Sequence, residues 1–219
     1  MTRLESADDD RMQRLADAEA LIRSRRTSLL VERERGIPPE MVERLCALVG
    51  MAPNHKRTRP WQVAVFTEDG RLALGRAFAA DVLARSRATG VLVPDAKMHK
   101  LESKYGRAPV IIVVGTYPVD DPIRHREDLY AVAAGVQNLL LGTAAAGLAA
   151  MWSSPPTAVA FEVNRLVGFA EGSELVAVVY LGYPSACPPD LVRQPIVARW
   201  CSSRDGLTNT NGSAGCDSE

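Results

Sequence analysis

The chain has 219 residues, of which 47% are hydrophobic and 24% charged, a composition typical of a globular protein with a substantial core. Its formal net charge is +0, so no overall field attracts it to nucleic acid or to an anionic membrane. Any anion site must therefore come from local clusters of basic residues. The four cysteines form no CxxC pair and no apolar leader opens the sequence, so we expect reduced thiols, no metal site and a cytoplasmic protein.

The N-terminal half is predicted to form helices around a first strand. Apolar residues recur at helical spacing over residues 10–28, and two prolines open a second helix at 38–51. The polar residues 1–9 before them are expected to be disordered. The sequence WQVAVFT predicts a strand at 61–67, and a third helix is expected at 71–88.

Two apolar runs in the second half predict strands buried on both faces. They are APVIIVVG at 108–115 and LVAVVYLG at 175–182. Between them we expect a long apolar helix at 125–150 and a shorter helix at 156–168. The stretch 130–152 is long enough to cross a bilayer, but its alanines and three glycines favour a helix buried inside the protein.

No repeat and no linker divides the chain, so we expect one domain at residues 10–200. The last residues, 201–219, are rich in Ser, Asn, Gly and Asp and are expected to be disordered. The order of elements predicts an α+β fold with a central mixed sheet flanked by helices.

Two basic motifs contain the residue types that bind a charged, planar ligand. Arg25-Arg26-Thr27 ends the first helix, where arginine favours the helix dipole but can also hold a phosphate in a forked geometry. The sequence APNHKRTRPW places Asn54 and His55 beside further basic residues and a rigid Pro-Trp corner. Fixed N–H donors there would stabilise negative charge on a ring, although a solvated loop is the alternative.

Two further motifs follow in the second half of the chain. The sequence GLAAMWS, which contains Met151, Trp152 and Ser153, ends the long apolar helix, and its small residues permit either a ligand or a second backbone to approach closely. The last strand ends in LGYP, and Arg193 follows within the sequence RQP. No nucleophile–base set, phosphate loop or dinucleotide fingerprint is present in the sequence.

Taken in order, these four motifs resemble those of the nitroreductase family of FMN-dependent NAD(P)H oxidoreductases. The form APNHK…PW is most similar to a small subgroup that carries APDHK…PW, and the resemblance covers about residues 18–200. It implies a nitroreductase-like fold and an interlocked homodimer with two FMN molecules in the interface. It also implies a ping-pong reaction, in which a hydride passes from NADH or NADPH through flavin N5 to a nitroaromatic, quinone or enone.

The resemblance implies that the protein supplies cofactor-binding residues and no catalytic side chain. The arginine motif would reach the phosphate, the ribityl chain or the pyrimidine edge, and the APNHK loop would contact the flavin bound mainly by the partner chain. The GLAAMWS motif would lie along the ring, and the arginine after LGYP would support the phosphate. The implied residues are Arg25, Arg26, Thr27, Asn54, His55, Met151, Trp152, Ser153 and Arg193.

Departures from the family pattern leave an alternative open. Leu29 and Leu30 stand where members usually have a basic residue, and Met51 and Ser153 stand where the similar subgroup carries one. A flavin-binding, flavin-storage or flavin-remodelling protein with little NAD(P)H turnover is therefore the alternative function. The variable segment 89–107 is expected to shape the substrate pocket, with a solvated helix face as the alternative.

Overall fold

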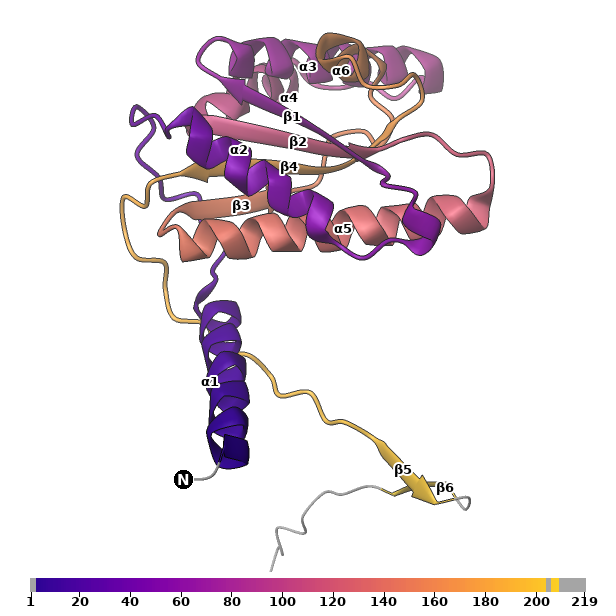
Figure 1. The fold of residues 1–219 in the computed structure, drawn as a ribbon. Coiled ribbons are helices and arrows are strands. Elements are labelled where there is room, and N and C mark those ends of the chain that lie inside the picture. Colours follow the sequence, from indigo (N-terminus) through magenta and orange to yellow (C-terminus); the bar gives the residue numbers. More distant parts are fainter. Residues whose placement is uncertain (1–2, 204–205, 209–219) are drawn as a thin grey trace, which may run out of the picture. The chain divides into compact units, whose positions relative to one another are not determined.

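The computed structural model describes residues 3–203 and 206–208, and it divides the chain into two compact units (Figure 1). The first unit is Met1–Pro188 and the second is Pro189–Glu219. This boundary precedes the end of the expected domain, residue 200, because the stretch after Pro188 has no helix or strand before Trp200.

The first unit is built on a four-stranded sheet of order β1-β2-β4-β3. Its strands are β1 (Trp61–Thr67), β2 (Val110–Thr116), β4 (Glu174–Gly182) and β3 (Ala149–Ser153). Neighbouring strands are antiparallel, and the parallel component of the expected mixed sheet is one isolated bridge between Thr27 and Ala150. Every residue of β2 is buried, as its β-branched run predicts. The α+β fold class is confirmed.

Helices cover both faces of this sheet (Figure 1). The helices α3 (Gly70–Thr89), α4 (Asp95–Ser103) and α6 (Phe161–Val167) lie over one face. The other face is covered by α2 (Pro39–Ala47), the short helix η1 (Leu48–Met51) and α5 (Pro122–Ala145). A short helix η3 (Lys104–Arg107) joins α4 to β2. The two faces form separate hydrophobic clusters, so each helical layer is fixed by its own core.

Small residues in α5 allow η1 to pack directly on it. A Cβ atom at Gly135 would lie only 2.6 Å from the carbonyl oxygen of Val49, so no larger residue fits there without a shift. The apolar stretch is therefore buried along one face, whereas Tyr130 is 67% exposed, so the expectation of a helix buried inside the protein holds only in part. None of the helices in the described residues has the length and apolar character needed to cross a membrane.

The main correction concerns the end of the predicted helix 125–150. The helix ends at Ala145, Gly147 adopts φ +68, and Ala149–Ser153 pair with β4 as strand β3. A left-handed glycine commonly ends a helix, and the pairing then overrides the helical propensity of the alanines. Helix α6 also begins later than expected, at Phe161 instead of residue 156.

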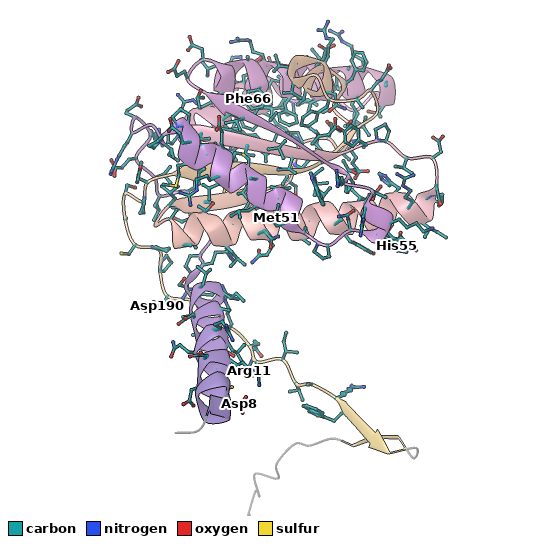
Figure 2. All side chains as sticks on the ribbon, in the orientation of Figure 1. Asp8, Arg11, Met51, His55, Phe66 and Asp190 are labelled. Atoms are coloured by element: carbon teal, nitrogen blue, oxygen red, sulfur yellow. The ribbon has the colours of Figure 1, made fainter. Side chains whose placement is uncertain are left out.

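Both predicted disordered ends contain described structure. Helix α1 (Arg3–Ser24) begins within segment 1–9, and it is supported by local pairs such as Arg11–Asp8 at 2.6 Å (Figure 2). In the second unit, β5 (Trp200–Ser203) and β6 (Gly206–Thr208) form a hairpin inside the segment expected to be disordered. Residues 209–219 of that segment lie outside the described residues.

Candidate functional site

A cavity of about 470 Å³ lies where the end of α1, the end of α5 and the start of β3 meet. We call it the arginine cavity because Arg25 and Arg26 line it, together with Ser28, Thr143 and Cys187. No carboxylate is among its described lining residues. The two forked guanidinium groups among these lining residues suit the phosphate of a cofactor.

Backbone pairing brings three of the four sequence motifs to this cavity. Thr27 forms the parallel bridge with Ala150, and the N–H of Ser28 donates to the carbonyl of Ala150 at 2.9 Å. Val31 then bridges Pro184, the proline of LGYP. The arginine motif, the GLAAMWS motif and the LGYP motif thus meet, although the first lies more than a hundred residues before the other two in sequence.

The two arginines have partners within the chain. The Arg26 guanidinium donates to the carbonyl of Arg23, and to that of Arg25 at 3.2 Å, so it caps the end of α1 while lining the cavity. Arg25 Nη1 lies 3.5 Å from Thr27 Oγ1. Both arginines are half-buried, which strengthens their attraction for an anion compared with fully exposed side chains.

The predicted ring-contacting residues continue along β3 away from the arginine cavity. In the sheet order, β3 is an edge strand, which presents backbone donors and acceptors on its outer side. Met151 is half-buried against the core beneath α3. Trp152 is 37% exposed, and its Nε1 donates to the carbonyl of Val176 at 3.4 Å. With Ser153, these residues follow Ala150 of the cavity along the edge strand.

The APNHKRTRPW loop has a strained backbone. Lys56, Arg57 and Arg59 have φ values of +50, +57 and +49, in the left-handed region that costs non-glycine residues about 1–2 kcal/mol each. The side-chain oxygen of Asn54 accepts a hydrogen bond from the N–H of Arg59 at 3.1 Å and closes the loop. Asn54 therefore has a structural role in shaping the loop.

Two contacts fix this loop to the beginning of α5. Thr58 Oγ1 donates to Asp128 Oδ1 at 2.6 Å, and His55 Nδ1 lies 3.8 Å from Glu127 Oε1. Asp128 is fifteen residues before Thr143 of the arginine cavity, which is roughly 22 Å along a helix axis. Figure 2 shows His55 beside the beginning of α5. Within one chain, Asn54 and His55 are therefore not brought to Arg25.

Arg193 lies in the second unit, and its role stays a prediction.

Some residues of the site gave no recognisable signal in the sequence. Asp128 and Glu127 are about seventy residues from the loop that they anchor, and no local pattern links them. Cys187 lines the arginine cavity, and only its position just after LGYP could have indicated this. The described residues contain no group of three His, Cys, Asp or Glu side chains arranged to hold a metal ion.

With this geometry in place, comparison with known proteins decides the family. The model of the nitroreductase family matches residues 22–183, most of the first unit. The chain belongs to the nitroreductase family. Membership supports flavin oxidoreductase chemistry at the level of the family.

Solved structures of nitroreductase-like proteins share the fold. A nitroreductase-like family protein from Bacillus cereus is 24% identical, with 80% of this chain and 89% of that chain covered and a TM-score of 0.67. The FMN-dependent nitroreductase NfnB from Mycobacterium smegmatis, solved with NADPH, is 21% identical (77% and 88% covered, TM-score 0.58). An iodotyrosine deiodinase bound to FMN and 3-iodo-L-tyrosine is 19% identical (84% and 99% covered, TM-score 0.61). At these identities the likeness shows the fold alone.

Proposed function

We propose that the protein is a cytoplasmic, homodimeric FMN-dependent oxidoreductase that takes a hydride from NADH or NADPH and delivers it to a nitroaromatic, quinone or enone acceptor. Bound FMN would supply the redox chemistry, because N5 of its ring accepts a hydride from one substrate and gives it to the next. The residues of the chain would bind and orient the cofactor and both substrates.

The observation that carries this proposal is the convergence of three separate motifs at the arginine cavity. Arg25 and Arg26 would hold the phosphate, and the hydroxyl of Thr27 would lie beside the ribityl chain. The edge strand would then support the ring through Met151 and Ser153. The charge and shape of the lining thus fit one elongated ligand with an anionic end and a flat end.

The position of the APNHKRTRPW loop supports sharing of each cofactor between two chains. The loop lies at the far end of α5 from the arginine cavity of its own chain. A second copy could place its Asn54 and His55 against the outer side of β3. These residues would then exclude water from the ring and donate hydrogen bonds to it, which lowers the free energy of negative charge that develops on reduction.

One observation favours the alternative of a flavin-binding protein with little turnover. Among the described residues, two cations line the arginine cavity. Leu30 and Met51, at positions where the family and subgroup resemblance implies a basic residue, are exposed apolar side chains. Fewer cations would weaken phosphate binding or change the flavin that is held. Such a protein could bind FMN without rapid hydride transfer.

A visible spectrum tests the proposal and separates the two functions. Purified protein, or protein reconstituted with FMN, is expected to be yellow, and anaerobic NADH or NADPH is expected to bleach the flavin absorbance. Bound FMN that neither nicotinamide bleaches would favour the alternative function. Protein that binds no FMN at micromolar concentration would contradict both.

A further inference from the structure

A second and larger cavity, of about 810 Å³, lies between the C-terminal half of α3, helix α4 and the loop after β3. We call it the lysine cavity. Its wall contains the apolar side chains of Val82, Val93 and Leu101. No carboxylate is among its described lining residues. Four cations line it: Arg85, Lys97, Lys100 and Lys104. Its volume is within the range of small-molecule sites.

The charges of the α4 and η3 segment are separated onto two sides. Lys97, Lys100 and Lys104 follow the spacing i, i+3, i+7, which places them on one helical face towards the lysine cavity. Glu102 and His99 line a different, shallower pocket with Arg76 of α3. Glu102, one of the two acidic residues of α4, therefore lies on the other side.

This arrangement is unfavourable unless an anion is present. Like charges at i, i+3 and i, i+4 destabilise a helix by about 0.2–0.5 kcal/mol per pair. Burial, with Arg107 and Lys100 nearby, lowers the pKa of Lys104 below its ordinary value. A bound anion would reduce the repulsion among these cations.

The walls of the lysine cavity are held by hydrogen bonds within the chain. The Asp81 carboxylate accepts hydrogen bonds from the N–H groups of Glu162 and Val163, which ties α3 to α6. Ser86 Oγ donates to the carbonyl of Val91 at 2.6 Å and folds the segment after α3 back onto the helix. The cavity is thus formed before any ligand binds, which reduces the entropy that binding would lose.

We infer that the lysine cavity binds a small organic acid, whose carboxylate or other acidic group lies among Lys97, Lys100 and Lys104 and whose apolar body packs on Val82 and Leu101. The cavity does not share a lining residue with the arginine cavity. Strand β3 joins the two, because it begins at Ala149 in the arginine cavity and ends at Ser153, shortly before Pro156 of the lysine cavity.

The inference is tested with 1-naphthoate, an organic acid with a flat apolar body, and with its neutral analogue 1-naphthamide. Calorimetric titration of the full chain, saturated with FMN and without NAD(P)H, measures binding separately from any redox turnover. We expect naphthoate to bind about tenfold or more tightly than naphthamide, and added salt to reduce the difference. The double variant Lys97→Gln/Lys100→Gln should lose most of this preference.

A matched control changes the other side of the same helices. The double variant Arg76→Gln/His99→Gln should bind naphthoate like the unchanged protein, since these residues line the shallower pocket. Equal binding of acid and amide, or an equal loss in both double variants, would overturn the inference. A second titration uses protein free of FMN. If added FMN then displaces naphthoate, the inference is also overturned, because the probe would occupy the arginine cavity.

Discussion

The two ends of α5 carry different parts of the candidate cofactor site, and they are built in different ways. At the C-terminal end, backbone pairing of Thr27 with Ala150 holds the arginine cavity together. At the N-terminal end, single side-chain contacts from Thr58 and His55 hold a strained basic loop. One end is part of the sheet architecture, whereas the other depends on a few polar interactions.

Because the two ends of α5 are far apart, one chain cannot bring both of them to the same FMN. If the arginine cavity and the loop contact the same FMN, as we propose, the loop must come from a second chain. The arginine end should then contribute most of the affinity for FMN, through its charge. The loop end should contribute less, mainly by keeping the loop in one conformation. The following predictions test that difference, from the largest expected effect to the smallest.

Replacement of Arg25 by alanine should have the largest effect on FMN binding. A charged hydrogen bond contributes about 1.5–3 kcal/mol, so the dissociation constant for FMN should rise about tenfold to a hundredfold. Quenching of FMN fluorescence measures this constant. Arg23→Ala is the control, because Arg23 is exposed and does not line the cavity. An unchanged dissociation constant in Arg25→Ala would show that the phosphate binds elsewhere.

Replacement of Gly135 by alanine should destabilise the connection between the two ends. The added methyl group would meet the Val49 carbonyl oxygen at 2.6 Å, so η1 must shift and the free energy of unfolding should fall by about 1–3 kcal/mol. Urea unfolding measures the change. Gly36→Ala should be nearly neutral, because nothing lies within 4 Å of the added atom. Similar stability of both variants would contradict the close packing of η1 on α5.

Replacement of Thr58 by valine should affect the loop end alone. It removes the 2.6 Å hydrogen bond to Asp128, which is 2% exposed, and should lower the unfolding free energy by about 1–2 kcal/mol. FMN affinity should fall only several-fold, much less than in Arg25→Ala. Thr67→Val, at an exposed strand end, is the control. A loss of FMN affinity as large as that of the arginine variant would remove the distinction between the two ends.

The smallest expected effect concerns the rates at which the thiols of Cys46 and Cys187 are modified. These rates should report on the arginine cavity. Burial, with Glu43 nearby, raises the pKa of Cys46 to about 11, so below that pH its thiol stays protonated and unreactive. Cys187 is exposed and should react first with a thiol reagent at pH 8, in a chain with Cys201 and Cys216 replaced by serine. Raising the pH towards 11 should accelerate Cys46.

Saturating FMN should slow the modification of Cys187, which lines the arginine cavity, and leave that of Cys46 unchanged. Mass spectrometry of the digested protein measures both rates. Modification of Cys187 that is indifferent to FMN would place the cofactor outside this cavity.

Much of the fold could be predicted because the strongest local patterns coincide with the structure. Strand β1 occupies the predicted residues, and β2 and β4 lie within about two residues of the apolar runs. Strand β3 was missed because alanine-rich AAMWS has helical propensity, and only pairing with β4 makes it a strand.

The site could be predicted only in part. Motif order indicated Arg25 and Thr27, and the structure places both beside Ala150 of the GLAAMWS motif. The anchoring of the loop by Asp128 could not be predicted, because it joins residues seventy positions apart. The lysine cavity was missed as a cavity for a similar reason. Its lysines are visible in the sequence, but the wall contributed by α3 and by Thr157 exists only after folding.

Subunit complementation tests most directly whether two chains share each FMN. One variant carries Arg25→Ala/Arg26→Ala and the other Asn54→Ala/His55→Ala, and both are expected to bind FMN weakly as homodimers. After the two are unfolded and refolded together, mixed dimers should contain one intact site, so about a quarter of the normal number of tight sites should return. A mixture that binds no more FMN than its two parents would contradict a site shared between chains.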